Sequence, residues 1–211
     1  MRLAKSVALP LVRKVVCIAC MRALESTMLG HPPAHHHSTV HPHPQTWVTL
    51  ATLMDGHELW LQQCNLLNFH PEPQRYEAGT RTSQDAADQL GCEVAHIAKS
   101  IVFQGQEGAV VVITSGANRV DRKKKLKSLL GYKPSMSDAI YIEATTGYVP
   151  GGVPPFGHVH PCTTIMDEDL FQYPLVWGAA GSADTVFPIT PAELQRMSGA
   201  QIGDVKQEGG G

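Results

Sequence analysis

Residues 146–158 are Thr-Gly-Tyr-Val-Pro-Gly-Gly-Val-Pro-Pro-Phe-Gly-His, with four glycines and three prolines in thirteen residues. Glycine permits positive φ and lets a ligand approach main-chain N–H groups, whereas proline stiffens the rest of the loop. Such a loop can hold N–H donors against an oxygen that gains negative charge during a reaction. It is not a P-loop, because no Gly-Lys-Ser/Thr follows, and its glycine spacing differs from the dinucleotide-binding fingerprint. A tight connecting loop without a binding role has the same composition, so this stretch alone leaves both interpretations open.

Short apolar segments on both sides of this loop predict a mixture of strands and helices. Thr82 and Asp85 form a capping box for a helix through Leu90, with Gly91 as its C-cap. The segment 138–145 fits either a strand or a short helix. Because the elements interleave without a regular βαβ period, we expect a mixed sheet flanked by helices, the α+β class. The other predicted elements are strands at 101–103, 109–114, 175–180 and 185–189, and helices at 58–67, at 121–130, from Asp167 to before Pro174, and from Thr190 onward.

The composition indicates one folded domain with a tail. The chain has 211 residues, of which 43% are apolar and 17% charged, as is normal for a folded protein. It has no apolar run long enough to span a membrane. Five scattered cysteines do not form a disulfide framework, so we expect a reducing compartment. Residues 55–211 hold 12 basic and 18 acidic residues, so nucleic-acid binding by this part would have to be local.

Residues 1–54 differ in composition from the rest of the chain. They carry five basic residues and one acidic residue, and residues 31–44 are rich in His and Pro, which predicts a disordered extension. Residues 1–30 resemble a mitochondrial or plastid targeting peptide, and an upstream extension without function is the alternative. We expect a cytoplasmic protein, or an organellar one if this peptide acts in targeting. The expected domain covers 55–205, and 206–211 form a flexible tail.

Two groups of basic residues are candidates for binding a phosphate or carbonyl oxygen. Lys99 lies among apolar residues at the start of a predicted buried strand, so its ammonium must reach water or an anion. A lysine with a buried stem and a solvated ammonium fits the same pattern. The predicted helix 121–130 and the residues before it concentrate positive charge, which suits a phosphate backbone and is also typical of a solvated surface. These residues are Arg119, Arg122, Lys123, Lys124, Lys125 and Lys127.

A metal or thiol site is a rival interpretation. On a strand, His158, His160 and Cys162 would share one face, as zinc ligands or a Cys–His pair require. Pro161 disrupts such a strand and no fourth ligand is evident, so we expect no metal and no cofactor. A serine hydrolase is not indicated either, because the sequence has no Gly-x-Ser-x-Gly elbow.

Taken in order, several segments resemble the YbaK family, which includes the editing domain inserted in bacterial prolyl-tRNA synthetases and its free-standing relatives. The resemblance covers residues 58–205, and its most specific parts are the loop that ends at His158 and the segment around Lys99. Residues 1–54 have no counterpart in it. The matching pieces are Arg81-Thr82 through Ala86-Ala87, Leu90-Gly91, Ile97 to Phe103, Arg119-Val120-Asp121, Thr146-Gly147-Tyr148, Gly151 to His158, and Gly181-Ser182 before Val186-Phe187-Pro188.

The resemblance implies a fold and a set of residue roles. The implied fold is a mixed, strongly curved and partly barrel-like sheet with flanking helices. Lys99 matches the lysine that orients the acyl-adenosine end of the substrate, and the Gly151-Gly152 backbone matches the loop that holds the scissile carbonyl. His158 matches the loop histidine near the amino-acid pocket. The other residues that the resemblance places at the substrate are Val153, Pro155, Phe156, Gly157, Asp121, Gly181 and Ser182.

The implied activity is hydrolysis of misacylated tRNA, most often tRNA-Pro carrying Ala, Cys or another small residue. The implied partners are this tRNA and prolyl-tRNA synthetase, without a membrane or a cofactor. An aminoacyl ester is already activated, so positioning, an oxyanion site and water can suffice, with the neighbouring ribose hydroxyl as a hypothetical proton carrier. A non-catalytic tRNA-binding or synthetase-associated module of the same fold is the alternative.

Overall fold

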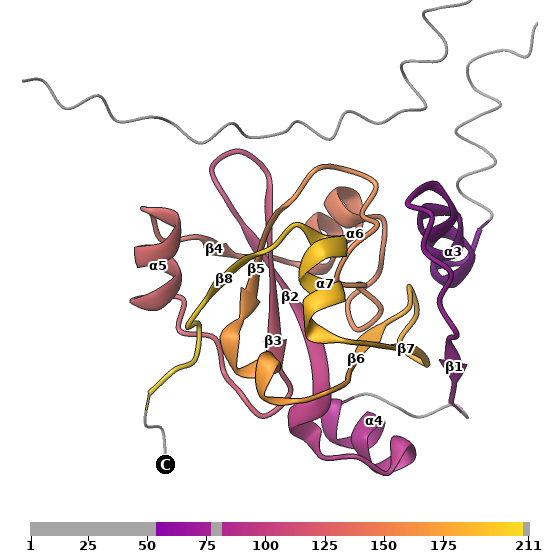
Figure 1. Ribbon diagram of the computed structural model, residues 1–211. Coiled ribbons are helices and arrows are strands. Elements are labelled where there is room, and N and C mark those ends of the chain that lie inside the picture. The colour runs from indigo at the N-terminus through magenta and orange to yellow at the C-terminus, as the bar shows by residue number, and fades with distance from the viewer. Residues whose placement is uncertain (1–53, 77–81, 209–211) are drawn as a thin grey trace, which may run out of the picture. The chain divides into compact units, whose positions relative to one another are not determined.

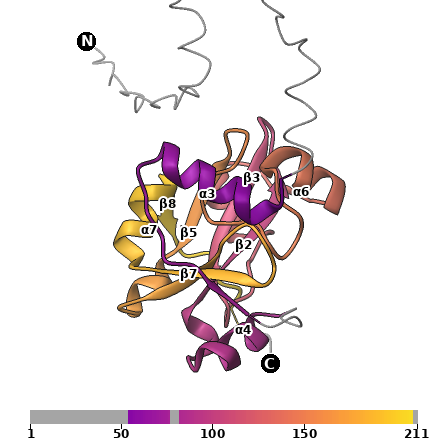
Figure 2. The same cartoon turned by 90° about the vertical axis from the view of Figure 1, so that its right-hand side faces the viewer.

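The computed structural model describes residues 54–76 and 82–208, which form one mixed sheet with helices packed around it (Figures 1 and 2). The strands are β1 (Gln74–Arg75), β2 (Ile97–Gln104), β3 (Ala109–Ser115), β4 (Ser135–Met136), β5 (Thr163–Asp167), β6 (Val176–Ala179), β7 (Thr185–Ile189) and β8 (Gln201–Gly203). The helices are α3 (Gly56–Leu66), α4 (Ser83–Leu90), α5 (Lys125–Leu130), α6 (Ala139–Thr146) and α7 (Pro191–Ser198), with the short 3-10 helices η2 (Val94–His96) and η3 (Glu168–Gln172).

The sheet mixes parallel and antiparallel neighbours. The strand order is β1-β7-β6-β2-β3-β5-β8, and β4 pairs with β2 off this path. The pairs β2–β6, β3–β5 and β5–β8 are parallel, whereas β1–β7, β6–β7, β2–β3 and β2–β4 are antiparallel. The predicted α+β class with a mixed sheet is therefore confirmed. The order is open between β1 and β8, so the described strands do not close into a complete barrel.

Local signals set the ends of the helices as expected. α4 begins after Thr82, whose side chain accepts from the Asp85 N–H (3.1 Å), and it ends at Gly91 in the left-handed conformation (φ 66°). The ambiguous segment 138–145 is helical, because Asp138 caps it by accepting from the Tyr141 N–H (2.8 Å). The predicted helices at 58–67 and from Thr190 are confirmed as α3 and α7, and the predicted strands are confirmed as β2, β3, β6 and β7.

Two predicted helices differ from the structure. The basic helix begins only at Lys125, because the Asp121 carboxylate accepts from the N–H groups of Lys123 (3.0 Å) and Lys124 (2.9 Å) and holds them in a turn. The segment after Asp167 is the 3-10 helix η3 and not an α-helix. Asp167 itself is a strand residue that caps η3, so its carboxylate lies inside the protein.

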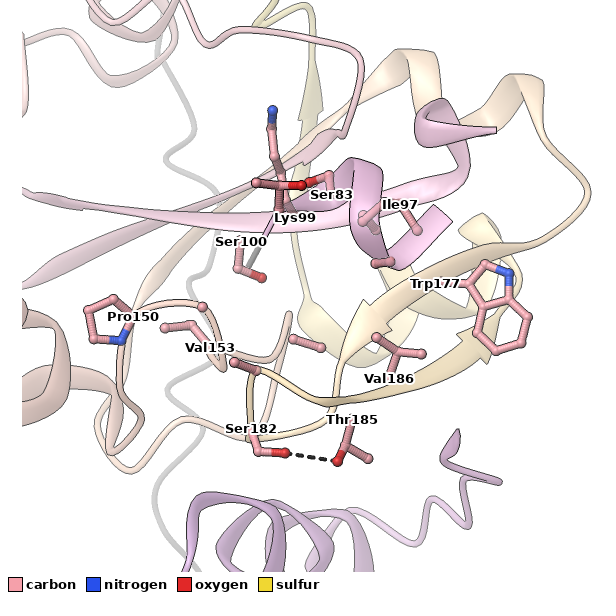
Figure 3. A pocket seen from close by; sticks show the side chains of 16 residues that line it. Ser83, Ile97, Lys99, Ser100, Pro150, Val153, Trp177, Ser182, Thr185 and Val186 are labelled. Carbon is pink, nitrogen blue, oxygen red and sulfur yellow. Dashed lines mark hydrogen bonds between the residues drawn. The ribbon is translucent and has the colours of Figure 1, made fainter. Parts of the chain in front are cut away.

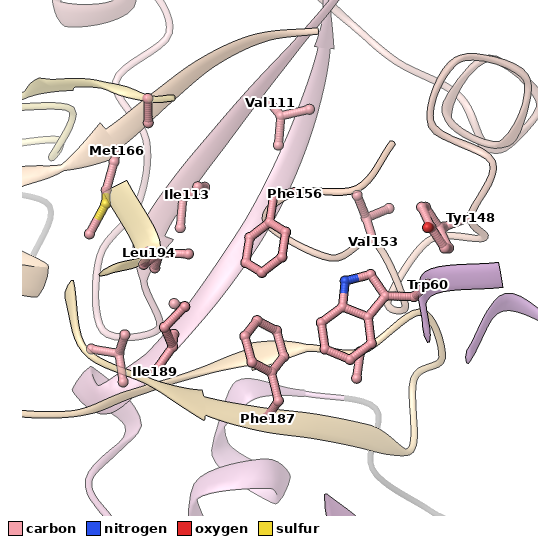
Figure 4. Close-up of a cluster of buried hydrophobic side chains, with 14 of the residues drawn as sticks. Trp60, Val111, Ile113, Tyr148, Val153, Phe156, Met166, Phe187, Ile189 and Leu194 are labelled. Atoms are coloured by element: carbon pink, nitrogen blue, oxygen red, sulfur yellow. The ribbon is translucent and has the colours of Figure 1, made fainter. Parts of the chain in front are cut away.

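The main core holds the 151–158 loop against the sheet (Figure 4). Trp60 of α3 packs against Phe187 of β7 with ring centroids 4.5 Å apart. Phe156 of the loop packs against the same ring at 5.6 Å. A second cluster on the other face of β2 and β3 contains Leu126 of α5. The loop is therefore anchored by an aromatic side chain near its end.

Several predictions concern parts of the chain that the structure does not describe. These are residues 1–53, Arg81, and residues 209–211 of the predicted tail. Earlier in that tail, Lys206 pairs with Val120, and the Gln207 N–H donates to the Arg119 carbonyl (2.7 Å). Within residues 54–76 and 82–208, no helix is long and apolar enough to cross a membrane.

Candidate active site

A pocket opens where β2 and β6 separate. The two strands pair only at Ile97 and Ala98 of β2, opposite Trp177 and Gly178 of β6. Beyond this point lies a pocket of about 320 Å³, close to the lower end for small-ligand sites (Figure 3). Residues of α4, the 150–153 loop, the turn between β6 and β7, and β7 complete its wall.

The pocket brings together some of the predicted site residues and leaves others outside its wall. Those that line it are Lys99, Gly151, Val153 and Ser182. Those that do not line it are Gly152, Pro155, Phe156, Gly157, His158, Gly181 and Asp121.

Lys99 borders the pocket with its stem, while its ammonium is held by a neighbouring turn. Its Nζ donates to the carbonyls of Asn118 (2.7 Å) and Gly116 (3.2 Å). An ammonium has three N–H donors, so one is left for a ligand. Burial lowers the pKa of Lys99, the charge of Arg119 lowers it further, and the charge of Asp167 raises it.

Lys99 lies on the face of β2 between two helices. On that face, Ile97 packs against α4, and Ile101 packs against the cluster that contains Leu126 of α5. Because side chains alternate along a strand, Lys99 lies between these two contacts. Figure 3 shows its side chain directed away from Pro150 and Val153.

Ser100 points the opposite way, towards the glycine-rich loop (Figure 3). Its neighbours Ala98 and Val102 on the same face belong to the main core together with Val153. The Ser100 Oγ is buried and has no hydrogen-bond partner within the part of the chain that the structure describes, and the residue lines the pocket. Sequence reasoning missed Ser100, although the two-residue period of a strand indicates that the residue after Lys99 faces the other side.

In the turn at residues 149–152, the main-chain N–H groups of Val149 and Gly151 are left without a partner among the described residues. The Gly152 N–H donates to the Val149 carbonyl (3.0 Å). Gly151 has φ +91°, which favours glycine. A Cβ on Gly152 would lie 2.9 Å from both the Gly181 oxygen and the Ser182 Cα, so two turns pack closely here.

Ser182 faces the pocket but its hydroxyl is engaged within its own turn. It donates to the Asp184 carboxylate (2.6 Å) and lies 2.9 Å from the Thr185 hydroxyl (Figure 3). The hydrogen bond from Ser182 is the main cause that lowers the pKa of Asp184. This network stabilises the turn against which Gly152 packs.

His158 stabilises the loop from outside the pocket wall. It lies 2.8 Å, Nε2 to O, from the Pro154 carbonyl, and the Tyr148 hydroxyl donates to the Gly157 carbonyl (2.7 Å). Burial lowers the pKa of His158, and the contact with Pro154 opposes this shift. The neutral imidazole is therefore the favoured form near pH 7.

We expect the fold to lose stability as the pH falls below about 6.5, and His158→Gln to weaken this dependence. Because the pKa of His158 is lower in the folded protein than in the unfolded chain, the unfolded chain binds more protons in this range. The contribution is present above the unfolded pKa and is lost as the pH falls through the folded pKa. Urea unfolding above and below this range measures it, with the exposed His160→Gln as control. An unchanged pH dependence in His158→Gln would contradict the assignment.

The structure does not assemble the zinc or thiol site. His158, His160 and Cys162 precede β5 and lie on no strand, so they do not share a face. Within residues 54–76 and 82–208, no group of three or more His, Cys, Asp or Glu residues could hold a metal ion. Burial raises the pKa of the Cys162 thiol to about 11, which keeps it protonated and weakly nucleophilic.

Only some of the cationic side chains in the predicted basic segment are exposed and unpaired in the described chain. Lys125 pairs with Asp204 and Glu208, and the Arg122 guanidinium donates to the Pro134 carbonyl (2.8 Å). Because Leu126 packs with Phe103, α5 covers the same face of β2 from which Lys99 projects. Within the predicted basic segment, the exposed cations that form no ion pair with a described residue are Arg119, Lys123, Lys124 and Lys127.

Comparisons with known proteins show the family of this chain. The family model described as aminoacyl-tRNA editing domain matches residues 77–197. The uncharacterized Bacillus subtilis protein YwhH is 30% identical over 128 residues, which cover 60% of this chain and 81% of YwhH. The Enterococcus faecalis protein EbsC, whose name proposes a Cys-tRNA(Pro)/Cys-tRNA(Cys) deacylase, is 29% identical over 125 residues, covering 59% of this chain and 76% of EbsC. A solved structure, described as that of a proposed trans-editing enzyme for prolyl-tRNA synthetase, has a TM-score of 0.70 and 37% identity, covering 74% of this chain and 99% of its own.

Proposed function

The chain belongs to the aminoacyl-tRNA editing domain family and is a hydrolase of the aminoacyl-tRNA ester bond, and on that premise we propose that it clears a small wrong amino acid from tRNA-Pro in trans. The proposed substrates are tRNA-Pro carrying Ala, Cys or a residue of similar size. The description of the solved structure, which refers to prolyl-tRNA synthetase, supports this choice of tRNA, and the name of EbsC includes Cys-tRNA(Pro) beside Cys-tRNA(Cys). Prolyl-tRNA synthetase is the proposed source of the mischarged tRNA.

The observation that carries the proposal is the meeting of three groups at one pocket. These groups are the free N–H of Gly151, the unpaired Oγ of Ser100 and the stem of Lys99. Residues from both faces of β2 line the pocket, Lys99 on one face and Ser100 on the other. In the proposed arrangement the acyl group lies on the Ser100 side, and the third N–H of Lys99 contacts the terminal adenosine.

The chemistry required of these groups is modest. Water attacks the ester carbonyl carbon, and the carbonyl oxygen gains the negative charge that the Gly151 N–H stabilises. The bond to the ribose oxygen then breaks, and this oxygen takes the proton that the attacking water gives up. The products are the free amino acid and tRNA with its hydroxyl restored. The neighbouring ribose hydroxyl is the proposed carrier of that proton.

The walls of the pocket support a preference for small side chains. Val153 and Val186 face the cavity together with Ala179 and Ala183. Rigid walls exclude a large side chain by size, whereas one methylene changes binding by only about 1–3 kcal/mol. We therefore propose strong rejection of large residues and weak discrimination among small ones.

The tRNA backbone is proposed to run from Lys99 towards α5. Arg119 directly follows Asn118, whose carbonyl holds the Lys99 ammonium. Lys123, Lys124 and Lys127 continue the exposed charge along this face. Such contacts neutralise phosphates and carry no sequence information, so selection of the tRNA needs further contacts.

A deacylation screen with the full chain tests this proposal. The substrates are tRNA-Pro charged with Ala, Cys, Ser, Thr or 2-aminobutyrate, and Pro-tRNA-Pro is the control. At least one small residue should be released about tenfold or more faster than Pro, the discrimination that pocket size alone can supply.

Two outcomes of the screen separate the parts of the proposal. If Cys-tRNA-Cys, assayed beside the screen, is hydrolysed as fast as Cys-tRNA-Pro, the choice of tRNA is contradicted and the size selection still stands. Hydrolysis of none of these substrates above the spontaneous rate would contradict the proposed substrate class altogether.

A further inference from the structure

Asp167 is a carboxylate in the interior of the protein, beside the turn that holds Lys99. It is the last residue of β5 and is 0% exposed. Its Oδ2 accepts from Thr114 Oγ1 (2.7 Å) and Asn118 Nδ2 (2.8 Å), and at longer range from Ser115 N (3.3 Å). None of the ion pairs in the described chain includes Asp167. A buried carboxylate is costly unless it is hydrogen-bonded, so its retention here calls for a reason.

The residues that bind Asp167 belong to the segment that binds Lys99. Asn118 connects the two, because its side-chain amide donates to Asp167 and its main-chain carbonyl accepts from the Lys99 ammonium (2.7 Å). Gly116, in the same turn, supplies the second carbonyl (3.2 Å). Asn118 is itself only 6% exposed, so the connection is shielded from water.

We propose that Asp167 is the positioning residue for Lys99, fixing the 115–118 turn so that its two carbonyls hold the ammonium beside the pocket. Asp167 does not line the pocket, so it acts on Lys99 and not on a substrate. The expected effect of Asp167 on deacylation rests on the proposed role of Lys99 in that reaction. The expected effect of Asp167 on the position and pKa of Lys99 does not depend on that role.

The charge of Asp167 also acts on Lys99. Burial and Arg119 lower the pKa of Lys99, whereas Asp167 raises it. The other charged groups around the turn are Asp169, which accepts from Asn118 (2.9 Å), and Lys206, which pairs with Asp169 (3.3 Å). Removing the charge of Asp167 should therefore lower the pKa of Lys99, and removing that of Arg119 should raise it.

The test is Asp167→Asn in the full chain, a change that keeps the size of the side chain. Deacylation by this variant should show kcat lowered about 10- to 100-fold with KM little changed, because the ammonium is misplaced. The alkaline limb of its pH–rate profile should move to lower pH, and that of Arg119→Gln to higher pH. Asp169→Asn is the matched control, since this carboxylate contacts the same amide but is partly exposed and paired with Lys206.

A second readout does not depend on activity. The Lys99 side-chain carbon signal, assigned by its loss in Lys99→Met, is titrated by NMR in the parent and in Asp167→Asn. A lower pKa of Lys99 in the variant supports the proposal even if no tested tRNA is hydrolysed. A folded Asp167→Asn protein with the parent pKa and pH profile overturns it. If Asp167→Asn does not fold, Asn118→Ala replaces it, and full activity with an unchanged Lys99 titration in that variant overturns the proposal.

Discussion

Replacing Lys99 by methionine is expected to lower the single-turnover rate of deacylation by about 100-fold, the cost of misplacing the reacting ester when the contact to its adenosine end is lost. Methionine keeps the apolar stem that borders the pocket and removes only the ammonium. The exposed cations Arg119, Lys123, Lys124 and Lys127 remain in this variant. The affinity for uncharged tRNA should therefore change by less than about threefold, as for the loss of one phosphate contact among several. Quenched-flow deacylation and filter binding measure the two quantities.

The control for Lys99→Met is Lys133→Met, which removes an exposed ammonium that does not line the pocket. This control should retain the parent rate. Two results would count against the assigned role of Lys99. One is a Lys99→Met protein that deacylates at the parent rate. The other is a loss of tRNA affinity that accounts for the whole fall in rate, which would make Lys99 a binding residue only.

Replacing Gly152 by alanine is expected to cost about 1–3 kcal/mol of folding stability, as overpacking does, because neither neighbour can yield easily. The added Cβ would lie 2.9 Å from the Gly181 oxygen and 2.9 Å from the Ser182 Cα, both of them backbone atoms. The turn must therefore shift, and the Gly151 N–H shifts with it. A displacement of this kind lowers the rate by an amount on the order of 100-fold. Thermal unfolding and single-turnover deacylation report the two effects.

Gly131→Ala is the matched control for Gly152→Ala. Gly131 has φ +79°, a Cβ added to it would meet nothing within 4 Å, and it ends α5 away from the pocket wall. Its replacement should cost about 1–2 kcal/mol through backbone conformation alone and leave the rate unchanged. If Gly152→Ala matches the parent in both stability and rate, the close packing of the two turns has no functional role.

The elements that the sequence predicts well are those with local signals at their ends. α4 follows from the Thr82–Asp85 capping box and from Gly91, and each of these residues makes the expected contact. The strands β1, β4 and β8 have only two or three residues, and pairing with a neighbour defines them more than their own sequence does. β5 escapes prediction because the polar residues at its ends, Thr163 and Asp167, conceal a short apolar centre.

The residues of the site also differ in how far local sequence signals indicate them. The sequence marks Lys99 and Gly151 as candidates by a lone lysine in an apolar segment and by a glycine pair, only the family resemblance gives them roles, and both residues line one pocket. The side on which each group faces depends on packing that no local pattern contains. The burial of Ser100 depends on the packing that covers both faces of β2. The position of Asp167 beside the turn depends on the pairing of β5 with β3. His158 lies in the predicted loop, but it contacts the Pro154 carbonyl and does not line the pocket.

The central claim is that the Gly151 N–H binds the acyl oxygen of the substrate, while the Lys99 ammonium binds the adenosine end on the other face of β2. The most direct test is a crystal structure of the full chain with adenosine carrying alanine on its 3′ position through a non-hydrolysable amide. The account predicts the acyl oxygen about 3 Å from the Gly151 nitrogen, a hydrogen-bond distance, with Lys99 in contact with the adenosine end. An analogue bound elsewhere, or bound in the pocket with its acyl oxygen turned away from Gly151 and without contact to Lys99, would contradict it.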